Sequence, residues 1–122
     1  MSDYKTERTR ILLDLTCAAD EIYTHRDKKS RILKGLVLRI IDEIQRMRDI
    51  DFERLFYEYH FILDGSFSYE RKPRKNMMSR GSRITKMTHI FLESGVTEYP
   101  TADAIDKTAI STLARRVILF YA

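Results

Sequence analysis

The sequence has few of the residues that form covalent cross-links or metal cages. It contains a single cysteine, Cys17, and no tryptophan among its 122 residues. A single cysteine excludes a disulfide within the chain and a zinc site built from several cysteine ligands. Glycine occurs four times and proline twice, mostly where turns are expected. The fold must therefore be stabilised by a hydrophobic core.

Long hydrophobic runs are also absent. No stretch approaches the roughly 20 apolar residues that a membrane-spanning helix needs. The polar start of the sequence is followed by no signal-peptide core. The expected location is the cytoplasm of the cell or host, with no membrane partner.

Recognisable catalytic and cofactor-binding motifs are lacking as well. There is no phosphate-binding glycine loop, no GxSxG sequence and no HExxH pair. His25, His60 and His89 are scattered, and none is spaced to share a metal with a carboxylate. We therefore expect no enzymatic activity, no catalytic residues, no metal and no cofactor.

Length and composition indicate one domain over residues 1–122. The sequence is 43% hydrophobic and 33% charged, which is ordinary for a globular protein. Folding at this size buries roughly two-thirds of the unfolded surface, which is enough for a single core.

The clearest helical pattern runs from Ser30 to Arg48. Its apolar residues recur with the spacing of one helix face: Ile32, Leu33, Leu36, Val37, Ile40, Ile41, Ile44 and Met47. Ser30 is expected to cap the N-terminus, and Asp42 with Arg46 forms a favourable i, i+4 pair. Gly35 costs a helix about 1 kcal/mol relative to alanine, so another backbone is expected to approach it closely.

A first helix is expected over residues 3–25. Its core face consists of Ile11, Leu12, Leu15, Ala18, Ala19 and Ile22. The polar run over residues 25–29 is expected to turn the chain. One long helix over residues 3–48 is the alternative, because this run contains neither glycine nor proline.

A third helix is expected over residues 51–63, with Asp51 as its N-cap. Its core face consists of Phe52, Leu55, Phe56, Tyr59 and Ile62. A small β-hairpin near Asp64-Gly65 is the alternative, since an Asp-Gly pair between apolar runs is a strong hairpin signal. In that interpretation residues 57–63 pair with residues 66–71.

Residues 66–82 are expected to form a basic loop, because they have no sustained periodicity and contain Pro73 and Gly81. A fourth helix follows over residues 83–94. Its inward residues are Ile84, Met87, Phe91 and Leu92, and Gly95 is expected to end it.

A last helix is expected from Ala102, with Thr101 as its cap. A helix-turn-helix within residues 101–121 is the less favoured interpretation, because no turn signal occurs inside that stretch. Together these segments predict an all-α fold, a compact bundle of about five helices.

Positive charge is concentrated in one part of the sequence. The net charge is only +4, and residues 1–70 hold 12 basic and 14 acidic residues. Residues 71–86 hold no acidic residue and seven basic ones: Arg71, Lys72, Arg74, Lys75, Arg80, Arg83 and Lys86. Such a segment suits a polyanion, because every phosphate that it neutralises releases counterions.

Aromatic residues gather directly before this basic segment. Seven of the 13 aromatic residues lie between Phe52 and Tyr69. Most fit the core face of the third helix, whereas Phe67 and Tyr69 fit no core face. These two are the better candidates for stacking on unpaired bases.

Three residues lie off the core stripes of the first two helices. They are Leu13, Cys17 and Leu38. A further layer of the fold or a second copy of the chain could cover them, so we expect a homo-oligomer.

These features favour binding over catalysis. The leading hypothesis is a small nucleic-acid-binding protein, a regulator or an accessory subunit of a nucleoprotein complex, that contacts DNA or RNA phosphates through its basic segment. The alternative is a protein–protein adaptor or inhibitor, viral or mobile-element encoded, whose basic loop docks on an acidic protein surface.

Overall fold

The computed structural model describes residues 4–23, 26–58 and 80–121. All regular structure within these ranges is helical, which confirms the all-α prediction. The elements are α1 (Tyr4–Tyr23), α2 (Lys28–Arg46), α3 (Asp49–Glu53), the π-helix η1 (Arg54–Glu58), α5 (Arg80–Glu93), the 3-10 turns η2 (Val96–Glu98) and η3 (Ala102–Ala104), and α6 (Lys107–Tyr121). None of these helices is long and apolar enough to cross a membrane.

Three of the sequence predictions fall partly on residues 59–79, which lie outside the described ranges. They are the C-terminal part of the third helix, the hairpin near Asp64-Gly65 and the basic loop. The predicted end of the basic loop was wrong, because residues 80–82 already belong to α5.

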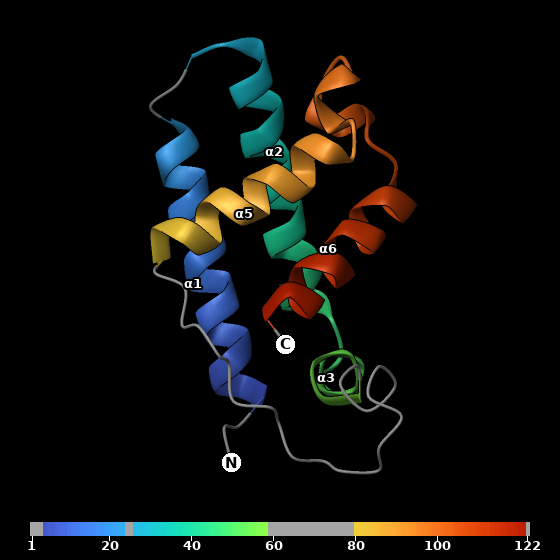
Figure 1. The fold of residues 1–122 in the computed structure, drawn as a ribbon. Coiled ribbons are helices and arrows are strands. Elements are labelled where there is room, and N and C mark those ends of the chain that lie inside the picture. Colours follow the sequence, from blue (N-terminus) through green and yellow to red (C-terminus); the bar gives the residue numbers. More distant parts are fainter. Residues whose placement is uncertain (1–3, 24–25, 59–79, 122) are drawn as a thin grey trace.

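The helices form two layers. α1 and α2 lie side by side and antiparallel, α5 crosses one side of this pair, and α6 packs along α2 on that same side (Figure 1). α3 and η1 continue the chain at the lower end of α2. This arrangement leaves the opposite side of the α1–α2 pair without a covering helix among the described elements.

The break between α1 and α2 rules out one long helix. Asp27 has an extended backbone and caps α2, since its side chain accepts hydrogen bonds from the Ser30 N–H at 3.4 Å and the Ser30 hydroxyl at 2.6 Å. Ser30 was therefore wrongly predicted as the cap. Asp27 takes this role because its extended backbone directly precedes Lys28, the first residue of the helix.

The core lies around α2, as its apolar stripe predicted. Leu36, Val37, Ile40 and Ile44 are completely buried. α5 contributes Met87 and Phe91, also completely buried, whereas Leu92 is 44% exposed and was wrongly predicted to face inward. Because α5 crosses the α1–α2 pair obliquely, only one narrow stripe of it reaches the core.

The expected close approach at Gly35 is confirmed, and the approaching segment is η3. A Cβ atom on Gly35 would lie 2.5 Å from the Cβ of Ala102. One turn further along α2, the Arg39 guanidinium donates hydrogen bonds of 2.6 Å to the carbonyls of both Ala102 and Ile105. Gly35 therefore lets η3 approach α2 closely, and Arg39 holds η3 there through its hydrogen bonds.

The last helix begins later than predicted, at Lys107. Thr101 makes no side-chain capping hydrogen bond. The cap of α6 is Asp106, whose carboxylate accepts a 2.7 Å hydrogen bond from the Ala109 N–H. Before Asp106 the Ala102 carbonyl accepts the Ile105 N–H at 3.2 Å, which closes a 3-10 turn instead of an α-helical one.

A buried polar contact joins the two ends of the described fold. The Tyr121 hydroxyl donates a 2.8 Å hydrogen bond to the Asp14 carboxylate and lies 3.5 Å from the Met87 sulfur. Tyr121 and Asp14 are both buried. A carboxylate in the core needs such a donor, since leaving it unsatisfied would cost about 1–3 kcal/mol or more.

Truncating the core stripe should unfold the protein more easily. We expect Ile40→Ala and Ile44→Ala each to lower the free energy of unfolding by about 2–5 kcal/mol, because each leaves a cavity among buried neighbours. Urea titration followed by circular dichroism measures this. The matched control is Ile50→Ala, since Ile50 is 50% exposed and should cost under about 1 kcal/mol. Near-neutral core variants would contradict this account of the core.

A second variant tests the contact between α2 and η3. Gly35→Ala improves helix propensity by about 1 kcal/mol, yet we expect it to destabilise the fold by about 1–3 kcal/mol, because its methyl group would clash with Ala102. Ala102→Gly added to this variant should restore part of the lost stability. If Gly35→Ala alone raises the melting temperature, η3 does not pack closely on α2.

Candidate nucleic-acid interface

The basic segment predicted from the sequence is only partly described. Lys86 is exposed on α5, and Arg80 and Arg83 belong to the same helix. Because α5 begins at Arg80, these three positions occupy its first two turns. Arg71, Lys72, Arg74 and Lys75 lie outside the described residues, as do the two predicted stacking residues, Phe67 and Tyr69.

A second group of basic residues lines a groove at the lower end of α2. The groove has a volume of about 530 Å³ and lies between the end of α2, α3 with η1, and α6. Four arginines line it, with two carboxylates and three other residues: Arg46, Arg48, Arg54, Arg115, Glu43, Asp51, Met47, Leu55 and Ser111. We call it the arginine groove.

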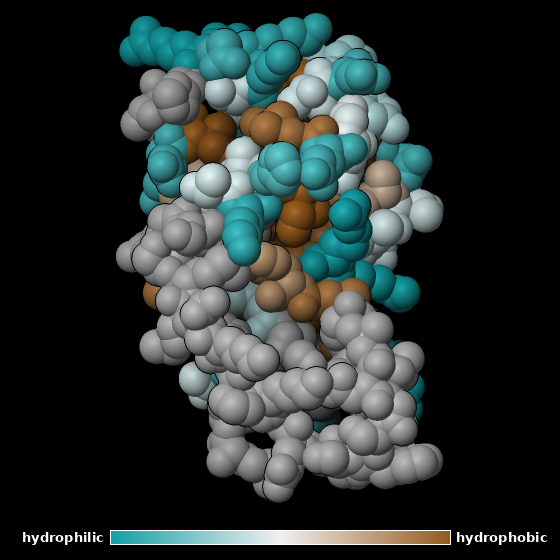
Figure 2. Space-filling model, viewed as in Figure 1, coloured by the Kyte–Doolittle hydropathy of each residue, from teal (hydrophilic) through white to brown (hydrophobic). Residues whose placement is uncertain are grey.

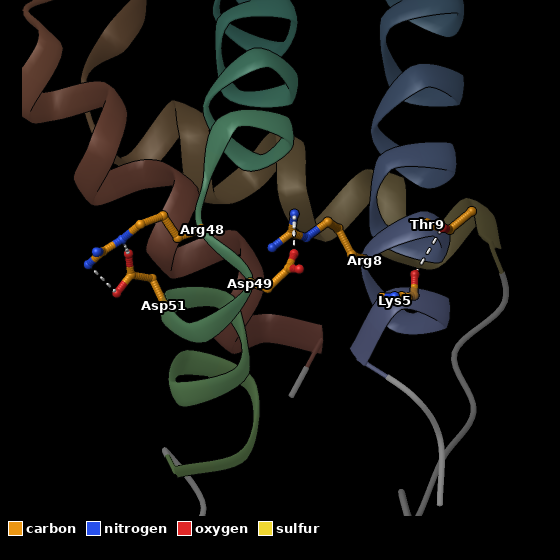
Figure 3. A network of polar contacts seen from close by, with 6 residues as sticks. All are labelled: Lys5, Arg8, Thr9, Arg48, Asp49 and Asp51. Atoms are coloured by element: carbon orange, nitrogen blue, oxygen red, sulfur yellow. Dashed lines mark hydrogen bonds and ion pairs between the residues drawn. The ribbon is translucent and has the colours of Figure 1, made fainter.

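Contacts with α1 fix the position of α3, and so that of the groove. The Arg8 guanidinium lies 4.8 Å from the centre of the Phe52 ring and 3.4 Å from the Asp49 carboxylate. Figure 3 shows Asp49 pointing from α3 toward Arg8, away from Asp51. Phe52 and Phe56 are buried beneath, as predicted, and their rings stack at 5.8 Å.

The linker between α2 and α3 contributes the most constrained cation of the groove. Arg48 donates hydrogen bonds to both Asp51 carboxylate oxygens, from Nε at 2.9 Å and from Nη2 at 3.4 Å (Figure 3). Asp51 was predicted to cap this helix, but its carboxylate faces the Arg48 side chain instead. The pair orients the Arg48 guanidinium across the start of α3.

This pair also shifts the protonation equilibria of both residues. The hydrogen bond from Arg48, with the charges of Arg48, Arg54 and Arg115, holds the pKa of Asp51 below its ordinary value, and Asp51 raises the pKa of Arg48. A lowered carboxyl pKa means that the pair stabilises the fold above the unfolded pKa and is lost as pH falls through the folded one. The lowered pKa of Asp51 and the raised pKa of Arg48 therefore keep both members of this pair charged at neutral pH.

The other arginines of the groove differ in their partners. Arg46 forms the predicted i, i+4 pair with Asp42, at 3.2 Å. Arg54 and Arg115 are exposed, and within the part of the chain that the structure describes they form no ion pair. Two guanidinium groups on separate elements are thus available to an external anion.

The three residues predicted for self-association are outside this groove. Leu13 is 56% exposed and Leu38 is 50% exposed, so neither belongs to the core. Cys17 is half-buried and packs partly against the core.

Two further clefts are less specialised. One, of about 370 Å³, lies between α1, α2 and α5 and includes His89, which pairs with Glu93 at 2.9 Å. Another, of about 320 Å³, lies beside α6. Figure 2 shows small hydrophobic areas separated by hydrophilic side chains on the α5 face. No group of His, Cys, Asp or Glu among the described residues is arranged to hold a metal ion.

The arginine groove suits phosphate better than it suits catalysis. Guanidinium groups bind phosphate oxygens through paired hydrogen bonds and remain charged at any physiological pH. Ser111 adds a neutral hydroxyl of the kind that also contacts phosphates.

Comparison with known proteins supplies no independent indication of function. The sequence matches no protein-family model, and searches of curated proteins and of solved structures found no match.

The arginine groove is not visible in the sequence. Arg54 on η1 and Arg115 on α6, which form no ion pair with another described residue, are brought together only by the packing of α6 against α2 and η1. The available signal was the Arg115-Arg116 pair within an otherwise apolar stretch. This arginine pair indicates that the last helix has an exposed side. It does not indicate which element lies opposite that side.

The Asp51 pair can be tested by titration. We expect the Asp51 carboxyl carbon, followed by NMR, to titrate below the ordinary value of 3.8. Arg48→Gln should raise this pKa toward the ordinary value, because it removes the main hydrogen bond. Arg46→Gln is the control, since Arg46 pairs with Asp42 instead. A wild-type Asp51 that titrates at its ordinary pKa would contradict the pairing.

Proposed function

We propose that this protein binds nucleic acid without catalysing a reaction, and that it contacts phosphates through the arginine groove and the basic segment over residues 71–86. The observation that carries the proposal is the pair of exposed guanidinium groups of Arg54 and Arg115, which line one groove and form no ion pair with another described residue. A phosphate between them would take the place that a carboxylate occupies in an ordinary surface ion pair.

The charge of the groove supports this function. Four arginines face two carboxylates, so a cationic surplus remains after each carboxylate is paired. Surplus cations on one surface attract a polyanion from a distance and weaken its binding as salt concentration rises. The neighbouring acidic residues limit how tightly generic polyanions are held.

The basic segment extends the proposed contact surface along the sequence. Arg80, Arg83 and Lys86 lie in the first two turns of α5, close to the first-turn backbone N–H groups, which favour phosphate. Phe67 and Tyr69 are the proposed stacking residues for unpaired bases. A cytoplasmic location and a regulatory or accessory role in a nucleoprotein complex complete the proposal.

Binding should depend on the groove in a measurable way. Fluorescence anisotropy with single- and double-stranded DNA and RNA across a salt series gives the slope of log K against log salt. Each lost phosphate contact on a duplex reduces that slope by about 0.9, so Arg54→Gln with Arg115→Gln should reduce it by about 2. Affinity should fall similarly for all sequences, because phosphates carry no base information.

The matched control is Arg26→Gln with Arg116→Gln. It removes the same charge from exposed positions outside the groove, and Arg116 directly follows Arg115, so it should leave the slope nearly unchanged. If neither variant differs from the wild type, the groove is not a phosphate site. If the wild type binds no oligonucleotide at about 50 mM salt, the surface serves an acidic protein partner, as in the adaptor alternative.

A further inference from the structure

The outer side of the α1–α2 pair has the features of a buried surface, but no element within residues 4–23, 26–58 and 80–121 buries it. Leu13 and Leu38 are large hydrophobic residues on these two helices that are 56% and 50% exposed. Leu12 and Ile41, each half-buried and packed against the core, are their hydrophobic neighbours. α5 and α6 lie on the other side of the pair (Figure 1).

Helix register places the two exposed leucines at the same level. Leu13 precedes the last residue of α1 by ten positions, and Leu38 follows the first residue of α2 by ten. Because the helices are antiparallel and each residue rises by 1.5 Å, the two side chains lie at equal distances from the connection between the helices.

Two oppositely charged residues also lie at the same level on the two helices. Asp20 follows Leu13 by seven residues and Arg31 precedes Leu38 by seven, so each charge lies on the same face as its leucine, about two turns away. Asp20 and Arg31 are exposed, and neither forms an ion pair with another described residue. α1 thus carries a leucine and an anion where α2 carries a leucine and a cation.

The two threonines on the same face of α1 as Leu13, Thr9 and Thr16, tolerate burial. The Thr9 hydroxyl donates a 2.9 Å hydrogen bond to the Lys5 carbonyl, and the Thr16 hydroxyl donates one of 2.8 Å to the Leu12 carbonyl. Since their donors are satisfied within α1, covering these threonines would leave no hydroxyl unpaired.

We infer that this surface binds a second copy of the same chain about a two-fold axis parallel to α1 and α2. Rotation about this axis places α1 of one copy antiparallel to α2 of the other. Each residue keeps its height along the axis. Leu13 then meets Leu38 of the other copy, and Asp20 meets Arg31, with each contact formed twice. The charges favour this arrangement over a parallel pairing of α1 with α1, because that pairing would bring the two Asp20 carboxylates to the same level.

The inference is independent of nucleic-acid binding and can be tested on the protein alone. Sedimentation velocity over a concentration series up to about 100 μM should show a monomer–dimer equilibrium, since small interfaces associate weakly. Leu38→Glu should shift the protein to monomer while circular dichroism stays unchanged. A wild type that remains monomeric throughout would overturn the inference.

Charge exchange tests the geometry. Asp20→Arg alone and Arg31→Asp alone should each weaken dimerisation by about tenfold, because both symmetric pairs become repulsive. The double variant carries both exchanged charges and should dimerise like the wild type. An equimolar mixture of the two single variants should form heterodimers, since opposite charges then meet in both pairs. If the wild type dimerises but the mixture does not, the proposed pairing of α1 with α2 is wrong.

Discussion

Burial of α2 from both sides is the constraint on which the rest of this structure depends. Its stripe of Leu36, Val37, Ile40 and Ile44 is fully buried, and no single neighbour could bury it alone. α1 covers one flank, while α6 and the η3 turn cover the other. α3 continues from the end of α2 and is held there by Arg8 of α1, so the groove between α3 and α6 also depends on that arrangement.

The sequence predicted the parts of the fold that depend on local periodicity. The α2 stripe, the limits of α1 within a few residues, and the close approach at Gly35 could all be read from spacing and residue type. The N-caps of the helices could not be predicted in this way, because Asp27, Ser30, Thr101 and Asp106 are all good capping residues. Which of them acts is decided by tertiary contacts, most clearly where Arg39 engages the carbonyls of η3.

The candidate site was less predictable for the same reason. A run of basic residues is visible in a sequence, whereas Arg54 and Arg115 are far apart until α6 packs against α2 and η1. Asp51 illustrates the difficulty: its position after Ile50 and before Phe52 resembles that of a capping residue, but the side chain of Arg48 competes for its carboxylate. Such choices depend on side-chain geometry, which periodicity does not contain.

The hydrogen bond between Tyr121 and Asp14 has a consequence for how the protein acquires its structure in the cell. Its partners are 107 positions apart in the sequence, so the Asp14 carboxylate cannot obtain this donor until nearly all of the intervening chain has left the ribosome. Until then the Tyr121 hydroxyl cannot contribute to the burial of that carboxylate, so the docking of α1 into the core lacks one of its hydrogen bonds. Non-local contacts of this kind slow folding, so the contacts around Asp14 are completed late, only after α6 has been synthesised.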